Sequence, residues 1–178
     1  MKLERIRVEF DVEQDRLLMR VLIGGGSEVR LWLTRRCVRR FWTAMIKMAE
    51  HQPDVQRQAN PEARTALLQI AHEKALQEVK FSRNDIEPPE TPPRVQPLGP
   101  EPLLVTRIQA RREADGRTLL ALLPSQGQGA HLTLSENLLH GLMKLMQQAV
   151  DRAEWDVTLE LPKAPMLSEA VPETRTLN

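Results

Sequence analysis

The fold of this chain is decided by residues 16–34, which read RLLMRVLIGGGSEVRLWLT. On both sides of the glycine run, apolar and polar side chains alternate with the period of two that is typical of a β-strand with one buried face. The expected inward-facing side chains are Leu17, Met19, Val21 and Ile23 before the glycines and Val29, Leu31 and Leu33 after them. Glycines 24–26 supply the positive φ that a tight hairpin turn needs. The alternative, a phosphate-binding loop, is disfavoured because such a loop leads into a helix, whereas here a strand follows.

The apolar period changes from two to 3.6 after Thr34, which predicts that a helix begins there. The Thr34 hydroxyl is suited to accept a hydrogen bond from the unpaired amides of the first helical turn. Upstream of the hairpin, Ile6, Val8 and Phe10 alternate with polar residues and predict a further strand. Residues 1–50 are therefore expected to form a β-β-β-α unit.

The pattern of residues 15–50 recurs in residues 116–151 when the two stretches are aligned without a gap. The aligned identities are Arg16 with Arg117, Gly26 with Gly127, Leu31 with Leu132, Leu33 with Leu134 and Met45 with Met146. Thr34 falls on Ser135, so each stretch places a capping hydroxyl where a helix should begin. We interpret the two stretches as copies of one unit.

The expected fold class is α+β, with two pseudo-symmetric β-β-β-α units packed as one fused domain. The first unit spans residues 1–50, and residues 51–85 hold an inserted helix that begins at Asn60 and Pro61. Residues 86–102 contain seven prolines and are expected to be a linker, with a polyproline ligand as the less favoured alternative. The second unit takes residues 103–161, in which residues 156–161 alternate and predict a final edge strand. Residues 162–178 are expected to be a mobile tail.

The composition limits the class of protein. The chain has 178 residues, of which 41% are hydrophobic and 28% charged, and its net charge is +1. No apolar run approaches the ~18 residues of a bilayer span, and the N-terminus lacks the apolar centre of a signal peptide. We therefore expect a cytoplasmic protein that does not contact a membrane. The single cysteine, Cys37, excludes a disulfide within the chain.

Candidate catalytic and metal-binding groups are few. His131 and His140 are the closest histidine pair, yet they lie on a predicted strand and a predicted helix, without further ligands at zinc-like spacing. Arg36 beside Cys37 would lower the pKa of the thiol, but the place of Cys37 at the flank of the apolar helix face favours a buried, unreactive side chain. No pair of carboxylates has the spacing of an acid–base pair. We therefore expect no catalytic residue, no metal and no cofactor, and an enzyme is the least favoured class.

The most informative cluster is a set of arginines in the helix that follows Thr34. At 100° per residue they share one helix face, opposite the apolar arc that contains Val38 and Trp42. The four residues are Arg35, Arg36, Arg39 and Arg40. The second copy has Glu136, Asn137, His140 and Gly141 at these positions, so the shared fold does not require arginine there.

The outward-facing positions of the predicted strands extend this basic surface, because they include Arg20, Arg30 and Trp32. Guanidinium groups pair with phosphates and an exposed indole can stack on bases, so this surface has the chemistry of single-stranded nucleic-acid binding. In the favoured alternative, other elements cover Trp32 and the arginines pair with carboxylates, since two-layer packing often covers both faces of a sheet.

The scarcity of catalytic groups favours a non-catalytic interaction or scaffold module that acts through protein–protein contacts within a larger assembly. The alternative function is binding of single-stranded DNA or RNA through the arginine-rich face of the first unit. A homodimer would cover exposed edge strands. The sequence does not identify the protein partner.

Overall fold

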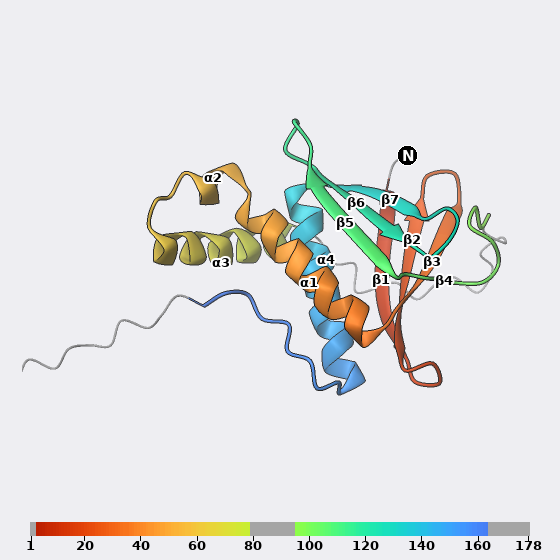
Figure 1. Cartoon of the computed structure of the whole chain (residues 1–178). Helices are drawn as coiled ribbons and strands as arrows, with labels where there is room; N and C mark the ends of the chain where they lie inside the picture. Colours follow the sequence, from red (N-terminus) through yellow and green to blue (C-terminus); the bar gives the residue numbers. More distant parts are fainter. Residues whose placement is uncertain (1–2, 79–94, 164–178) are drawn as a thin grey trace, which may run out of the picture.

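The computed structural model describes residues 3–78 and 95–163 and shows an α+β fold with two sheets and four helices in these ranges (Figure 1). The first sheet has the strand order β1-β2-β3-β4 and the second the order β5-β6-β7. The strands are β1 Leu3–Asp11, β2 Arg16–Ile23, β3 Ser27–Leu33, β4 Leu103–Leu104, β5 Arg107–Arg112, β6 Thr118–Leu123 and β7 Ala130–Leu134. The helices are α1 Arg35–Glu50, α2 Pro53–Gln56, α3 Pro61–Glu78 and α4 Glu136–Ala153.

The predicted hairpin and both predicted helix starts are confirmed. The turn between β2 and β3 places Gly25 at φ 86° and Gly26 at φ 73°, conformations that L side chains rarely adopt. The Thr34 Oγ1 atom accepts a hydrogen bond from the Cys37 amide at 3.2 Å. The Ser135 hydroxyl caps α4 in the same way. The predicted inward-facing side chains of β2 and β3 all lie in the core, most of them fully buried.

Helices α1 and α4 lie beside each other, and each contacts the sheet that belongs to the other half of the chain (Figure 1). The helix that follows the first sheet, α1, packs against β5 of the second sheet, while α4 packs against β1 of the first sheet. One continuous hydrophobic core therefore includes side chains from both sheets and both helices. Neither half has a core that is separate from the other.

The segment between α1 and β4 contains two helices, whereas the sequence predicted one. A short helix, α2, precedes α3, and the predicted cap of α3 is present because Asn60 Oδ1 accepts a hydrogen bond from the Glu62 amide at 2.8 Å. Helix α3 packs against α4, and in Figure 1 it projects away from the sheets. The end of the expected insertion, residues 79–85, lies outside the described residues.

The Pro-rich linker is described only from Val95 onward, because residues 86–94 of it lie outside the described ranges. The Val95 carbonyl accepts a hydrogen bond from the Glu28 amide at 2.8 Å, so the end of the linker runs along the free side of β3. The chain then forms β4, which pairs parallel to β3 and which the sequence pattern did not predict. A strand of two residues is too short to show an alternation.

The prediction of an edge strand at residues 156–161 is wrong. These residues are extended but pair with no strand in the part of the chain that the structure describes. Their backbone carbonyls accept hydrogen bonds from side chains of α1 and α4, and their apolar side chains join the hydrophobic core, which the same period of two permits. Of the expected mobile tail, residues 164–178 lie outside the described ranges. No helix in the described ranges is long and apolar enough to cross a bilayer.

Candidate functional site: a basic groove beside helix α1

A groove of about 560 Å³ lies between the first turns of α1 and the segment that connects β4 to β5. It forms where two neighbouring strands leave the first sheet, because β3 continues into α1 and β4 continues into β5. Its lining residues are Thr34, Arg36, Cys37, Arg40 and Ala44 on one side and Leu104, Val105, Thr106, Arg107, Ile108 and Gln109 on the other. We call this feature the basic groove.

Three arginines give the basic groove its charge. Arg36 and Arg40 lie one helical turn apart on α1, and Arg107 faces them from the start of β5. All three are exposed, and within the described residues none of them has an ion-pair or hydrogen-bond partner on its side chain. The first turn of α1 contains no acidic residue, so its unpaired amides add to the positive potential. The groove is therefore suited to an anionic group.

Cys37 lines the groove as a buried thiol. It is buried, and this burial raises the pKa of its thiol to about 11, although Arg40 acts in the opposite direction. The thiol is therefore protonated at neutral pH, as expected for a buried cysteine. Within the described residues, no group of three or more His, Cys, Asp or Glu side chains could hold a metal ion.

The other two arginines of the predicted helix cluster lie on the opposite flank of α1, and each has an interaction partner within the chain. Arg35 forms an ion pair of 2.7 Å with Asp15 and lies 5.2 Å from the ring centroid of Trp155. Arg39 donates a hydrogen bond of 3.0 Å to the carbonyl oxygen of Asp156. The pKa of Asp15 is lowered, mainly by a hydrogen bond from the Trp155 indole and further by Arg35. The four arginines thus share an exposed helix face but not one binding surface.

The strand residues of the predicted site lie together on the outer face of the first sheet. Arg20 and Arg30 are directly opposite each other on β2 and β3, and Trp32 is opposite Leu18. Arg20 Nε forms an ion pair of 3.0 Å with Oε1 of the buried Glu28, as the favoured alternative expected for this face. The Nε atom of Arg30 is buried without a hydrogen-bond partner in the described part of the chain. Trp32 is half-buried, so this indole is only partly available for stacking.

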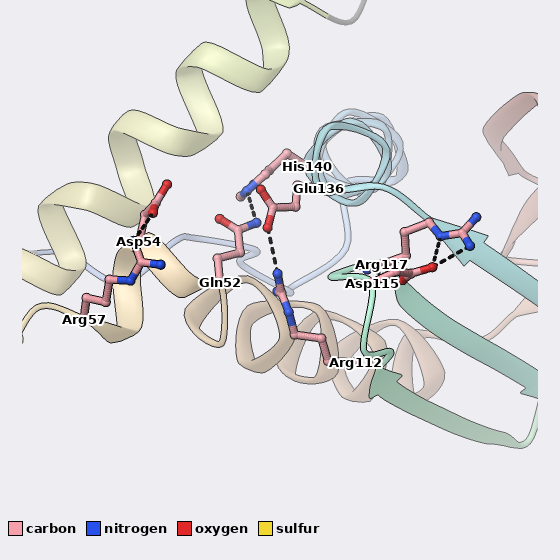
Figure 2. Close-up of polar contacts among 8 residues, drawn as sticks. All are labelled: Gln52, Asp54, Arg57, Arg112, Asp115, Arg117, Glu136 and His140. Carbon is pink, nitrogen blue, oxygen red and sulfur yellow. Dashed lines mark hydrogen bonds and ion pairs between the residues drawn. The ribbon is translucent and has the colours of Figure 1, made fainter.

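A buried polar cluster, which sequence reasoning missed, joins α3 and α4. Gln52, His72 and His140 are 4%, 7% and 1% exposed, respectively, although all three are polar. Gln52 Nε2 lies 3.0 Å from His140 Nε2, and His72 Nδ1 lies 3.1 Å from His140 Nδ1 (Figure 2 shows the first contact). The available signal was the position of His72 between Leu68 and Ala75 on the apolar stripe of α3.

The contacts of this cluster are satisfied when both rings are uncharged. The Gln52 amide nitrogen can only donate, so His140 Nε2 must accept and His140 Nδ1–H then donates to His72. Burial, and secondarily the neighbouring His72, lowers the pKa of His140 to about 4. Burial is also the main cause that lowers the pKa of His72. At neutral pH both rings are therefore uncharged, and the cluster joins α3 and α4.

One ion pair near this cluster connects the second sheet to α4. Arg112, at the end of β5, forms an ion pair of 2.8 Å with Glu136 in the first turn of α4 (Figure 2). A carboxylate in the first turn of a helix also interacts favourably with the helix dipole.

Comparison of the chain with protein-family models, with curated proteins and with solved structures finds no match, so its function has to be inferred from this geometry.

Proposed function

We propose that the protein is a non-catalytic interaction module that binds an acidic segment of a partner protein in the basic groove. The observation that supports this proposal is the convergence of Arg36, Arg40 and Arg107 on one groove, without an ion-pair partner among the described residues. Three guanidinium groups without a carboxylate are an arrangement that a bound anion would complete.

The lining of the basic groove favours a peptide over a nucleic acid. Aliphatic side chains, among them Ala44, Leu104 and Ile108, lie between the arginines, and Leu104 is 39% exposed. None of the lining residues is aromatic, so the groove offers no side chain on which a base could stack. A segment that combines Asp or Glu with apolar residues matches both features. The volume of the basic groove lies in the range of about 300–1,000 Å³ that is typical of ligand sites.

We also propose that the two β-β-β-α halves arose by duplication and that the basic groove was added to the first copy. At the positions of Arg36 and Arg40, the second copy has Asn137 and Gly141, and both helices begin at a capping hydroxyl. Gly141 is buried in α4, whereas Arg40 is exposed on α1, so the two copies use this helix face differently, and in the first copy it is open to a ligand.

The test is fluorescence anisotropy with a fluorescein-labelled peptide of alternating glutamate and leucine, at low and at physiological salt. The variant Arg36→Gln/Arg40→Gln should weaken binding at least about tenfold, as expected for the loss of two charge-assisted contacts. The matched control is Arg35→Gln/Lys47→Gln, which removes the same charge from the same helix but outside the groove. An equal loss in both double variants would mean non-specific attraction and would contradict the proposal.

A second candidate function is binding of single-stranded nucleic acid on the outer face of the first sheet. It is supported by Arg20 directly opposite Arg30, since like charges across a strand pair are destabilising, and by Trp32 beside them. A labelled oligothymidine of about 20 nucleotides should then bind with an affinity that falls with salt and that drops on Trp32→Ala. Oligonucleotide binding without peptide binding would replace the first proposal by this one.

A further inference from the structure

The chain after α4 forms a strap, residues 155–163, that bends at Asp156 and then crosses three helices. Helix α4 ends at Ala153, and its C-cap residue, Glu154, adopts the left-handed conformation with φ 51° and ψ 30°. From this turn the strap runs back along the helices toward α3 (the blue segment in Figure 1). It pairs with no strand in the described ranges, so its backbone is free to bond with side chains.

Side chains from three helices hold the strap by its backbone. Each donates one hydrogen bond to a strap carbonyl oxygen, which is a mode of recognition that does not depend on the strap's own side chains. The bonds are Arg39 Nη2 to Asp156 at 3.0 Å, Trp42 Nε1 to Glu160 at 3.1 Å, Gln69 Nε2 to Pro162 at 3.1 Å and Gln147 Nε2 to Leu159 at 2.7 Å. We call these four donors and the helix surface around them the strap site.

The strap side chains alternate between the hydrophobic core and solvent, and the Trp155 side chain lies beside β1, where it contacts Phe10 and donates a hydrogen bond to Asp15 Oδ1. Trp155 and Leu159 are each 7% exposed and belong to the hydrophobic core, and two half-buried residues of the same parity pack against it. The intervening residues are exposed, and two of them, Asp156 and Glu160, are acidic. The strap therefore combines backbone hydrogen bonds with an apolar residue at every second position. Peptide-recognition sites bind extended peptides through the same two features.

We propose that the strap site is a peptide-binding site, which the chain's own strap occupies in cis, and that it takes an extended segment of a partner protein with an apolar residue at every second position. Displacement is open to such a segment because the strap is continuous with α4 only through the turn at Glu154. A non-glycine residue in the left-handed region costs about 1 kcal/mol, and release of the strap would remove this cost.

The partner is expected to be a different protein and not a second copy of this chain. A tethered strap has an effective concentration in the millimolar range, far above that of an identical segment in solution. An identical strap in trans therefore cannot compete, whereas a partner segment with additional contacts can. Displacement would also free Gln69 of α3 from the bond that now connects this helix to the strap.

The test uses the full chain and a fluorescein-labelled peptide with the sequence of residues 154–163. The variant Leu159→Asp places a charge in the buried strap position and should release the strap, so this variant should bind the labelled peptide at least about tenfold more tightly than the unaltered chain. A control peptide in which each apolar residue is exchanged with its polar neighbour has the same composition but the opposite parity and should not bind. Adding Gln147→Leu to Leu159→Asp should weaken peptide binding.

Two results would overturn the proposal. One is a Leu159→Asp variant that keeps its helical circular dichroism but does not bind the peptide, and the other is equal binding of both peptides.

If Leu159→Asp does not fold, a protease site inserted between Glu154 and Trp155 can be cut in the folded chain. The cut strap should then exchange with excess labelled peptide, and a folded, cut chain that does not exchange refutes the site. A chain dimer in light scattering that the peptide dissociates would make a second copy the occupant and overturn the assignment to a different protein.

Discussion

Acidification should destabilise the protein through the buried histidine cluster. In the folded chain, Gln52 donates to His140 Nε2 and His140 Nδ1–H donates to His72. Protonation of His140 would place a second N–H against the Gln52 amide nitrogen, so two donors would face each other in a buried site. The folded state therefore resists a proton that an unfolded histidine accepts readily.

The magnitude follows from the pKa of His140, which is about 4 in the folded chain against an ordinary value of 6.5. This difference corresponds to about 3 kcal/mol at ~1.4 kcal/mol for each pH unit. Because the folded pKa lies below the unfolded one, the unfolded state binds the proton first as the pH falls. The stabilising contribution is complete above pH 6.5 and is lost as the pH falls from 6.5 toward 4. A loss of about 3 kcal/mol is large against a typical stability of about 5–15 kcal/mol.

Charged groups around the cluster act on the same equilibrium. Lys144 of α4 lowers the pKa of His72, and Glu73 of α3 raises it, but burial is the largest cause. A hollow beside His140 is also lined by the charged residues Asp54, Lys74, Glu78 and Glu136. Because these charged groups also act on the cluster, the pH dependence of one protein is not sufficient, and variants have to be compared.

The assay is denaturant unfolding between pH 7 and pH 4 for the unaltered chain, for Gln52→Glu and for His131→Gln. A carboxylate at position 52 can accept a hydrogen bond from protonated His140, so Gln52→Glu should raise the pKa of His140 and reduce the loss of stability on acidification. His131 is exposed on β7, and its replacement should leave the pH dependence unchanged. Direct titration of the His140 ring protons by NMR is decisive. A folded-state pKa near 6.5 would refute the reasoning.

Three further predictions concern the core, the first helix and the thiol. Leu17→Ala, at a fully buried position, should lower the free energy of unfolding by about 2–5 kcal/mol in a urea titration, and a loss below about 1 kcal/mol would contradict the burial of this side chain. Thr34→Ala removes the hydrogen bond to the Cys37 amide and should cost about 1 kcal/mol, whereas Thr34→Ser should restore most of it in thermal unfolding. Cys37, buried and with its pKa raised to about 11, should react with a thiol reagent slowly in the folded chain and rapidly in urea, and equal rates would show that it is accessible.

The sequence by itself determined the local structure and the buried faces of the first sheet. Alternation in residues 16–34 is a property of the backbone period, so it specifies which side chains of β2 and β3 turn inward whatever they pack against. Thr34 and Ser135 mark the starts of α1 and α4 because a capping hydrogen bond spans only three residues. The burial of Cys37 and the turn at Gly25 follow from equally local rules.

Only the tertiary structure decided what lies against each face. The period of two at residues 156–161 is the same for a strap on helices and for an edge strand, and the choice depends on Arg39, which is 117 residues away from Asp156. Similarly, one helix face holds all four arginines, yet only Arg36 and Arg40 meet Arg107, because β4 happens to direct the chain past α1. Gln52 and His140 are 88 residues apart, so no local pattern indicates their contact. Periodicity tells which side of an element is buried, whereas the partner that buries it is set by contacts between residues far apart in the chain.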